Sequence, residues 1–434
     1  MERRFAAAGR LRGTMRPPPD KSISHRAALI GAMGGAAVIE NYLNAADTRA
    51  TLAAVRGLGG QVDARPARSA EGHPLGQVVA IDGPGLRGAS AAEIDVGNAG
   101  TLLRLLPGWL AGQGEGSWTL DGDASIRQRP VDRVAVPLRR MGAQVECRDD
   151  RLPPLRIQGA PLTGIDYKLP VASAQVKSCL LLAGLLAEGE TTLVEPSPTR
   201  DHTERMLRAA GAELRSEDGR VSVKPAERLA AERIGIPGDL SSAAFPIVAA
   251  LLVPESEIEI EGVGLNPTRA GLLAILERMG AGLEVEEAAA VGGEPQGTIR
   301  ARASKLSGTR VDGDEVALAI DELPLVALAA CFAEGETVIA EAGELRHKES
   351  DRIAAVCEEL AALGGEVEPT DDGMVIQGTG GLRGGGLDAH GDHRMAMLGA
   401  VAGVASREGV DVRGFEAVEV SYPGFEADLA ALLE

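Results

Sequence analysis

The chain has 434 residues, of which 44% are hydrophobic and 25% are charged, so it has the composition of a globular protein long enough for two domains. Its formal net charge is −19, and it contains only five Phe, three Tyr and two Trp. This acidic balance and the scarcity of aromatic rings exclude a general nucleic-acid-binding surface and a stacking platform for bases, so we expect no nucleic-acid partner.

The first predicted helix follows the prolines of RPPPDKSISHRAALIGAM, residues 16–33. The prolines keep the chain extended up to Asp20, which is a suitable N-cap for a helix beginning at Lys21. Lys21, His25 and Arg26 then fall in the first two turns, where the helix dipole disfavours positive charge. Cations at an unfavourable place indicate that an anionic ligand binds there.

A phrase of helix end, glycine and strand recurs along the chain as RGLGGQVDA, RRMGAQVEC, RAAGAELRS, ERMGAGLEV and AALGGEVEP. We interpret each glycine as a helix C-cap ahead of a strand. Spacings of 83, 69, 69 and 84 residues separate these marker glycines, which are Gly59, Gly142, Gly211, Gly280 and Gly364. The pattern predicts six α/β units of about 72 residues, in two domains of three that join near residues 225–235. The alternative is an ordinary α/β protein with chance similarity between its segments.

Cations recur at later predicted helix starts. Arg104 follows NAGTLL, Lys177 lies in PVASAQVKS, and Arg394 follows a predicted Asp392 cap in HGDHRMAM, while DASIRQRPVDR forms a basic loop. The segment RHKESDRIAAV opens a helix whose predicted buried stripe comprises Ile353, Val356, Leu360 and Leu363. Any one of these cations could be a solvated charge or the partner of a nearby acid. Their recurrence at equivalent points of the repeats instead indicates one strongly anionic ligand.

The four cysteines, Cys147, Cys179, Cys331 and Cys357, lie far apart and form no CxxC pair. This usage is typical of reduced thiols and not of a disulfide or zinc framework. The opening MERRFAAAGRLRG lacks an adequate apolar region for secretion, and no apolar run approaches the ~18 residues of a membrane span. We therefore expect a cytoplasmic protein with no membrane partner.

Ten short motifs follow one another between about residues 11 and 430: DKSISHRA, GNAGTLLR, RQRP, ASAQVKS, TRDHTE, PGDLSSAAF, DELP, LRHKESDR, GDHRMAM and SYPGF. In kind and order they resemble the motifs of the 5-enolpyruvylshikimate-3-phosphate synthases, also called 3-phosphoshikimate 1-carboxyvinyltransferases. The resemblance implies an α/β fold of two inside-out domains, each of three βαβαββ repeats. One domain would comprise residues 15–230. The other would comprise residues 1–14 and 231–434, with the N-terminal strand crossing back to the C-terminal half.

The resemblance also implies the reaction. The family joins phosphoenolpyruvate to the 5-hydroxyl of 3-phosphoshikimate and releases phosphate, in the shikimate pathway to chorismate and aromatic amino acids. The implied contacts to 3-phosphoshikimate are Lys21, Ser22, Arg26, Ser173, Ala174 through its backbone, Gln175, Arg200, Asp321 and Lys348. The implied contacts to phosphoenolpyruvate are Lys21, Gly100, Arg129, Gln175, Arg352 and Arg394. Both substrates carry a phosphate and a carboxylate, which accounts for the gathered cations.

Acid and base are needed as well as charge neutralisation. We assign Asp321 as the base at the 5-hydroxyl and Glu349 as the donor of the proton to the methylene carbon, with Lys21 as an alternative acid. From the residues alone, Asp321 could equally be a helix cap and Glu349 a first-turn acid. No metal or cofactor is expected, because lysines and arginines neutralise the phosphate charge, and the HxxH pair of His390 and His393 has no evident third ligand.

Two further features bear on this assignment. GPGLRG fits a dinucleotide fingerprint, but the following ASAAEIDVGN does not read as a helix, so we expect no dinucleotide site. Some family members carry a lysine just before the SYPGF-like motif, where this chain has Val420 and Ser421, so that contact is absent or supplied differently. We expect Tyr422 and Phe425 of this motif to serve packing.

Two other functions remain open. A sister enzyme transfers enolpyruvyl to UDP-N-acetylglucosamine and usually has a reactive cysteine in its mobile loop. The stretch GDASIRQRP has none, although Asp123 could take its place. A non-catalytic phosphosugar-binding protein is the second alternative, against which the presence of both Asp321 and Glu349 argues. We expect a monomer. The resemblance also implies sensitivity to glyphosate, the family inhibitor that competes with phosphoenolpyruvate, because Gly100 leaves room that an alanine methyl group would fill.

Overall fold

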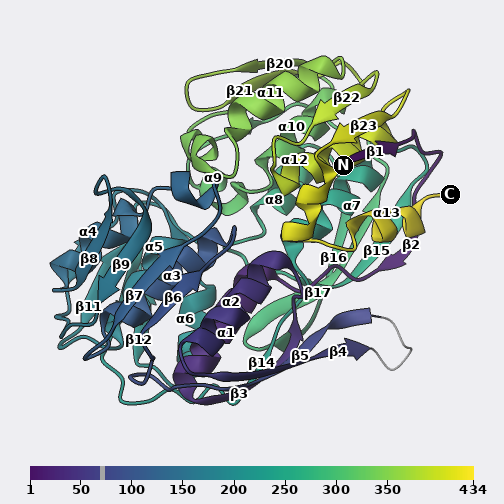
Figure 1. The fold of residues 1–434 in the computed structure, drawn as a ribbon. Coiled ribbons are helices and arrows are strands. Elements are labelled where there is room, and N and C mark those ends of the chain that lie inside the picture. The colour runs from purple at the N-terminus through teal and green to yellow at the C-terminus, as the bar shows by residue number, and fades with distance from the viewer. Residues whose placement is uncertain (69–73) are drawn as a thin grey trace. The chain divides into compact units, whose positions relative to one another are not determined.

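The computed structural model describes residues 1–68 and 74–434 and has a mixed α/β fold (Figure 1). The chain divides into two compact units. The N-terminal unit comprises Pro19–Pro237 and Ala290–Glu294, and the C-terminal unit comprises Met1–Pro18, Gly238–Ala289 and Pro295–Glu434. The described residues form five sheets of four strands and one of three. The predicted α/β class is confirmed.

Each sheet belongs to one repeat, and the second repeat shows the pattern most simply. Its sheet has the order β6-β7-β9-β8, in which β6 (Ala92–Asp95) and β7 (Ser117–Asp121) are parallel. The strands β8 (Gln144–Arg148) and β9 (Leu152–Gln158) form an antiparallel hairpin, and β9 is also antiparallel to β7. Helix α3 (Gly100–Ala111) connects the parallel pair, as such a connection requires. A second helix, α4 (Asp132–Arg140), lies between β7 and β8, so the chain order of the repeat is βαβαββ.

The N-terminal unit contains three such repeats. The first comprises α1 (Lys21–Gly34), β3 (Ala36–Tyr42), α2 (Ala46–Gly57), β4 (Gln61–Arg68), β5 (Pro74–Asp82) and, from the end of the unit, β14 (Arg233–Gly235). The second adds η1 (Ile126–Gln128) to the elements given above. The third comprises β10 (Asp166–Lys168), α5 (Ala174–Gly184), β11 (Thr191–Val194), α6 (His202–Ala209), β12 (Leu214–Glu217) and β13 (Arg220–Val223).

The C-terminal unit repeats the plan and takes two strands from the N-terminus of the chain. Its first repeat comprises β2 (Arg12–Met15), α7 (Leu240–Leu252), β15 (Glu257–Gly264), α8 (Gly271–Arg278), β16 (Gly282–Val291) and β17 (Glu294–Arg302). The second comprises β18 (Arg310–Val311), α9 (Asp314–Ala319), α10 (Leu323–Phe332), β19 (Glu336–Ile339), η2 (Gly343–His347), α11 (Arg352–Ala362), β20 (Glu366–Pro369) and β21 (Met374–Gln377). The third comprises β22 (Gly385–Asp388), α12 (His393–Ala405), β23 (Val410–Arg413), η3 (Phe415–Val420), α13 (Phe425–Leu432) and β1 (Glu2–Phe5).

Each of the five marker glycines follows the helix that precedes the last two strands of its repeat, so the predicted order of helix end, glycine and strand is confirmed. They follow α2, α4, α6, α8 and α11, and all five have φ between 87° and 101°. In this left-handed region a Cβ atom is unfavourable, which explains why glycine recurs there. A strand begins two or three residues later in each case.

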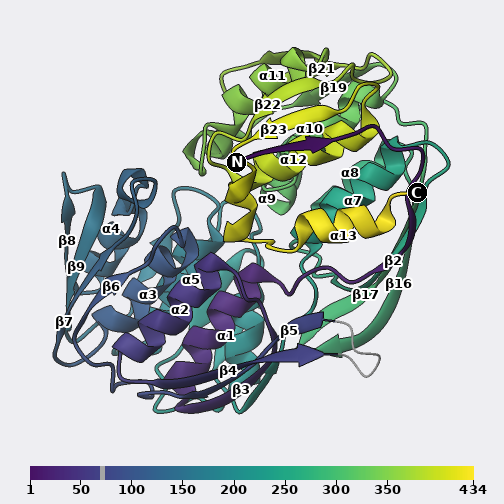
Figure 2. The same cartoon turned by 45° about the vertical axis from the view of Figure 1, so that its right-hand side comes forward.

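In each repeat the helix that leads into the central strand β3, β7, β11, β15, β19 or β23 lies in the interior of its unit; these helices are α1, α3, α5, α7, α10 and α12. In α12 every residue from His393 to Val404 is buried, and in α10 every residue from Leu323 to Cys331 is buried. Such helices are apolar all round because other elements surround them. Helix α3 packs against α1 and α5, and α12 packs against α7 and α10. Figure 2 shows α1, α3 and α5 together, with the strands of the same unit outside them. Helices are thus inside and sheets outside.

Two of the places where the chain passes between the units are Pro18–Pro19 and Pro237–Gly238. In the N-terminal unit the backbone N–H of Asp20 donates to the carbonyl of Pro237 at 2.9 Å, and in the C-terminal unit the N–H of Asp239 donates to Pro18 at 2.8 Å. Each of these two connecting segments therefore ends at the N-cap of an interior helix, α1 or α7.

Among the described residues, none of the helices is long and apolar enough to cross a membrane.

Candidate active site

The start of α1 carries the first predicted cations. Asp20 caps the helix as predicted, because its Oδ1 accepts a hydrogen bond from the N–H of Ile23 at 2.8 Å. Lys21 Nζ lies 3.1 Å from Oδ2 of Asp47, a buried carboxylate in the first turn of α2. Lys21 therefore has a nearby acid as its partner in this structure, which sequence reasoning did not identify.

Arg26 is buried, yet its hydrogen-bond partners among the described residues are all neutral. Its Nε donates to Oγ1 of Thr203 at 2.8 Å, its Nη2 to Oγ of Ser178 at 3.0 Å and its Nη1 to the carbonyl of Ser22 at 2.9 Å. Burial lowers the pKa of Arg26 to about 10; the carboxylate of Glu204 opposes this shift and the positive charge of Arg200 adds to it. Two guanidinium groups that disfavour each other's charge would both be stabilised by an anion.

His25 does not add to this positive charge. Burial, together with the charges of Lys21 and Arg26, holds the pKa of His25 well below its ordinary value, so the ring is neutral near pH 7. Its Nδ1 lies 2.6 Å from Oγ1 of Thr51. The imidazole is a buried structural group, unlike the two cations beside it.

Gly100 and Arg129 are neighbours in the second repeat. Gly100 is the first residue of α3, and Arg129 follows η1 with only 7% of its surface exposed. Arg129 Nη2 donates to Oδ1 of Asn98 at 3.1 Å, and Asn98 Nδ2 donates to Oδ2 of Asp123 at 2.7 Å. Asp123 also accepts from the N–H of Ile126 at 2.9 Å, so it orders the loop that carries Arg129.

Helix α5 presents the next predicted residues at its N-terminus. Ser173 is the N-cap, with Oγ accepting from the N–H of Val176 at 3.4 Å, and Ala174 is the first helical residue. Gln175 Oε1 accepts from Arg104 Nη1 at 2.7 Å, which links α5 to α3. Arg200 lies in the loop between β11 and α6.

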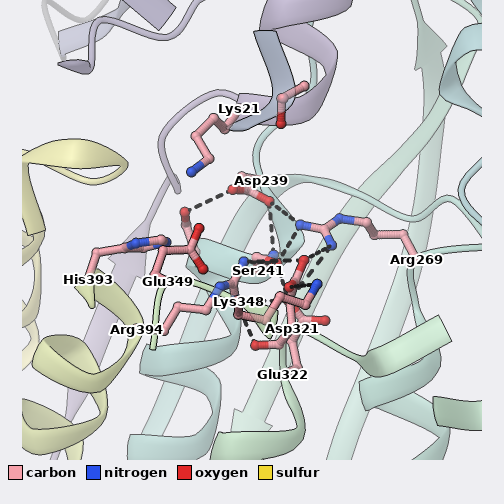
Figure 3. A network of polar contacts seen from close by, with 12 residues as sticks. Lys21, Asp239, Ser241, Arg269, Asp321, Glu322, Lys348, Glu349, His393 and Arg394 are labelled. Carbon is pink, nitrogen blue, oxygen red and sulfur yellow. Dashed lines mark hydrogen bonds and ion pairs between the residues drawn. The ribbon is translucent and has the colours of Figure 1, made fainter. Parts of the chain in front are cut away.

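The C-terminal unit gathers its predicted residues around Asp321, and Figure 3 labels Asp321, Lys348, Glu349 and Arg394 among them. Lys348 Nζ lies 3.2 Å from Oδ1 of Asp321, and Arg352 Nη1 lies 3.4 Å from the same oxygen. Arg394 Nη1 donates to the backbone carbonyl of Asp321 at 2.9 Å, while its Nη2 lies 3.8 Å from Oδ2. The three predicted cations, which are 27 to 73 residues away in sequence, thus surround one carboxylate.

Arg352 connects Glu349 to this group. It is 1% exposed; its Nη2 lies 2.7 Å from Oε2 of Glu349, and its Nε lies 2.8 Å from Oδ2 of Asp392. Burial by itself lowers the pKa of Arg352, but the carboxylates of Asp392, Glu349 and Asp321 raise it above the ordinary value, so the guanidinium stays charged. Asp392 also caps α12 as predicted, accepting from the N–H of Arg394 at 2.9 Å.

Four further residues of this cluster were missed by sequence reasoning. Arg394 Nη1 lies 3.2 Å from Oε1 of Glu322, and its Nη2 donates to Oγ of Ser241 at 3.2 Å. Arg269 Nη2 lies 3.2 Å from Oδ1 of Asp239, and the hydroxyl of Ser241 contacts both Arg269 and Glu322 (Figure 3). The signal was available, because three of the four lie in PGDLSSAAF and DELP. Together these buried groups fix the guanidinium of Arg394.

The arrangement supplies the parts of an acid–base reaction on an anionic substrate. The predicted residues fall into two groups, one in each unit. In the C-terminal unit all five predicted residues are linked through Asp321 and Arg352. In the N-terminal unit Gly100 lies beside Arg129, and Gln175 and Arg26 are each held by neighbouring helices. A carboxylate beside an ammonium group and buried guanidiniums can accept a proton while the cations neutralise phosphate charge.

Two smaller expectations have clear outcomes. Tyr422 and Phe425 are buried and pack edge to face with ring centroids 5.4 Å apart, so the packing assigned to them is confirmed. The glycine-rich GPGLRG is followed by a loop and β6 and not by a helix, which confirms that it lacks the strand–helix context of a dinucleotide fingerprint. The two histidines of the HxxH pair each lie near a carboxylate. His390 Nε2 is 2.7 Å from Oε1 of Glu359, and His393 Nδ1 is 3.7 Å from Oδ1 of Asp392.

Known proteins similar to this chain agree on one family. The model of the family described as EPSP synthase (3-phosphoshikimate 1-carboxyvinyltransferase) matches residues 5–429. A 3-phosphoshikimate 1-carboxyvinyltransferase of Synechococcus sp. (strain JA-3-3Ab) is 48% identical over 429 residues, which cover 98% of this chain and 95% of the relative. The solved EPSP synthase of Acinetobacter baumannii is 40% identical, with a TM-score of 0.86 and coverage of 100% and 98%. The enolpyruvyl transferase NikO of Streptomyces tendae, 20% identical with a TM-score of 0.76 over 99% and 96% of the chains, shares the fold. The chain therefore belongs to the EPSP synthase (3-phosphoshikimate 1-carboxyvinyltransferase) family.

Proposed function

We propose that the protein transfers the enolpyruvyl group of phosphoenolpyruvate to the 5-hydroxyl of 3-phosphoshikimate and releases phosphate. The observation that carries the proposal is the group of Lys348, Glu349 and Arg352 around Asp321, in a chain that belongs to this family. A protein that only binds a phosphosugar has no need of two carboxylates among its cations. Both acid–base chemistry and charge neutralisation are available here.

The 3-phosphate of 3-phosphoshikimate binds where the cations of the N-terminal unit lie close to one another. Arg26 and Arg200 raise the cost of each other's charge, which a phosphate dianion would relieve. The N-terminus of α5 adds the backbone N–H groups of its first two residues, Ala174 and Gln175, for which helix geometry provides no acceptor within the helix. The full set of proposed contacts is Lys21, Ser22, Arg26, Ser173, Ala174, Gln175 and Arg200, with Asp321 and Lys348 at the ring hydroxyls.

Phosphoenolpyruvate binds to a second set of cations. Arg129, Arg352 and Arg394 supply planar guanidinium groups that match carboxylate and phosphate oxygens. Gly100 lets Arg129 approach the start of α3 without the obstruction of a side chain. The proposed contacts are Lys21, Gly100, Arg129, Gln175, Arg352 and Arg394.

The reaction proceeds by addition and elimination. Asp321 accepts the proton of the 5-hydroxyl as this oxygen bonds to C2 of phosphoenolpyruvate, and Glu349 or Lys21 donates a proton to C3, which becomes a methyl group. In the second step the methyl group returns that proton, the C2–C3 double bond forms again, and the C2–O bond to phosphate breaks. Lys348 and the arginines stabilise the anionic intermediate and the leaving phosphate electrostatically.

Initial rates of phosphate release test this proposal. We expect release with phosphoenolpyruvate and 3-phosphoshikimate, none with UDP-N-acetylglucosamine, and a loss of about 10² to 10⁴ in kcat for Asp321→Asn, as for removal of a general base. Release only with the nucleotide sugar would assign the protein to the sister activity. Tight binding of 3-phosphoshikimate without any release would favour a non-catalytic phosphosugar-binding protein.

The protein acts as a cytoplasmic monomer, because every proposed substrate contact comes from one chain and its four cysteines are unpaired. Burial raises the pKa of Cys331 to about 12 and that of Cys357 to about 11, so these thiols are protonated and unreactive near pH 7. Thiol titration of the denatured protein should find four thiols, and light scattering should give a mass close to 44.8 kDa. A disulfide or a dimer mass would contradict this part of the proposal.

A further inference from the structure

Lys177 is a buried lysine to which the proposed reaction assigns no role. It lies in α5, two residues after Gln175, and is 1% exposed. Burying an ammonium group is costly unless carboxylates and hydrogen-bond acceptors surround it. Lys177 also lies beside the proposed phosphate contacts, so the free-energy cost of burying its ammonium group calls for a role at that site.

The ammonium group of Lys177 has three partners from two other parts of the N-terminal unit. Its Nζ lies 2.8 Å from Oε2 of Glu195, just after β11, and 2.7 Å from Oε1 of Glu204 in α6. It also donates to the backbone carbonyl of Thr199 at 3.3 Å, and the hydroxyl of Thr199 donates to Glu195. One side chain therefore ties α5 to both ends of the loop between β11 and α6.

This loop carries Arg200, and the elements tied together hold Arg26. The carbonyl of Thr199 belongs to the peptide group that leads directly into Arg200, so Lys177 restrains the backbone at that residue. Thr203, next to Glu204, and Ser178, next to Lys177, accept the hydrogen bonds of Arg26 and lie 2.6 Å from each other. The contacts of Lys177 thus restrain both the backbone that leads into Arg200 and the residues next to the two hydroxyl groups that bind Arg26.

The net charge of the cluster formed by Lys177, Glu195 and Glu204 also connects Lys177 with the phosphate-binding arginines. One lysine and two carboxylates leave the cluster with a formal charge of −1 in the interior. The carboxylate of Glu204 raises the pKa of Arg26 against the effect of burial and of Arg200. The carboxylate of Glu204 therefore helps Arg26 to remain charged beside Arg200 before any phosphate binds.

We propose that Lys177 is a positioning residue that holds Arg200 and Arg26 at the spacing required by the 3-phosphate of 3-phosphoshikimate. This inference rests on the proposed function, and it concerns binding of one substrate and not the chemical step. Lys177 touches neither substrate.

Steady-state kinetics of Lys177→Met test the inference. We expect the KM for 3-phosphoshikimate to rise about 10-fold or more, as for a lost charge-assisted contact, while kcat and the KM for phosphoenolpyruvate stay within about 3-fold. Lys177→Met with Glu204→Gln keeps the cluster at −1 and should show the same selective rise, even if the single variant does not fold. Lys224→Met is the matched control, because Lys224 pairs with Glu213 on the surface of the same unit and its loss should leave all three parameters unchanged.

A cycle with Arg200→Ala separates positioning from general stability. Because the proposed role of Lys177 is to hold Arg200 at the right spacing from Arg26, that role is lost once Arg200 is removed, so Lys177→Met should add less than about 3-fold to the KM for 3-phosphoshikimate in the Arg200→Ala background. A full additional rise, or a loss confined to kcat, would overturn the inference. The inference would also be wrong if Arg200→Ala weakens 3-phosphoshikimate binding while Lys177→Met, alone and combined with Glu204→Gln, leaves the kinetics unchanged. Absence of activity in the wild type would instead contradict the proposed function.

Discussion

A Cβ atom placed on Gly100 would lie 2.5 Å from Nη1 of Arg129. Real Cβ atoms do not approach other heavy atoms so closely, so a side chain at position 100 must displace the guanidinium group. The backbone of Gly100 is helical and needs no special conformation, and glycine is therefore present there for space and not for flexibility. Arg129 is held on its other side by Asn98, which limits where it can move.

Gly100→Ala should weaken phosphoenolpyruvate binding selectively. We expect the KM for phosphoenolpyruvate and the inhibitory concentration of glyphosate, which competes with it, both to rise about 10-fold, as for one impaired charge-assisted contact. Initial rates at varied phosphoenolpyruvate measure both. Gly114→Ala is the control, because a methyl group there meets no atom within 4 Å. An unchanged KM for phosphoenolpyruvate in Gly100→Ala would refute the role of this contact.

Single arginine substitutions should separate the two substrates. Arg26→Ala is expected to raise the KM for 3-phosphoshikimate, and Arg394→Ala that for phosphoenolpyruvate, each by about 10- to 100-fold, as for a lost charged hydrogen bond. The test is a full kinetic matrix with each substrate varied at saturating levels of the other. If each variant weakened both substrates equally, the assignment of these residues would be wrong.

The buried pair of Arg352 and Asp392 should dominate local stability. Asp392→Asn leaves the guanidinium without its bidentate partner and should lower the free energy of unfolding by about 3–5 kcal/mol. Urea denaturation measures this. Asp411→Asn, which removes an exposed partner of Arg4, should cost less than about 1 kcal/mol. Similar losses in the two variants would show that burial does not set the strength of the Arg352 pair.

The same pair predicts how stability depends on pH. Burial by itself raises the pKa of Asp392, but the charge of Arg352 lowers it below the ordinary value of 3.8. A depressed carboxyl pKa contributes stability that is present above 3.8 and is lost as the pH falls below it. The difference in unfolding free energy between wild type and Asp392→Asn should therefore be constant near neutral pH and shrink below pH 3.8. A difference that grows on acidification would contradict this sign.

Local patterns were enough to predict the repeats. The marker glycines could be identified because a left-handed C-cap demands glycine at each equivalent turn, and Asp20 and Asp392 because a helix start demands an acceptor. The sixth repeat has no marker glycine. Its last strand is β1 (Glu2–Phe5), paired with β23 at the other end of the chain, and no local pattern encodes such a pairing.

The partners of the site residues could not be predicted in the same way. Lys177 meets Glu204 only because α5 and α6 pack together, and Arg394 meets Ser241, which lies 153 residues earlier, because α12 packs on α7. A sequence shows that cations gather at helix starts but not which carboxylates compensate them. Resemblance to a family supplied the residues of the site, whereas the structure supplied the contacts that hold them.

The most direct test of the proposed reaction is ³¹P NMR of the wild-type protein with phosphoenolpyruvate and 3-phosphoshikimate. We expect the phosphoenolpyruvate signal to be replaced by inorganic phosphate in equal amount, while the ester phosphate of 3-phosphoshikimate is retained at a shifted position as the ring gains the enolpyruvyl group. Spectra that remain unchanged, or phosphate released from 3-phosphoshikimate itself, would contradict enolpyruvyl transfer by this protein.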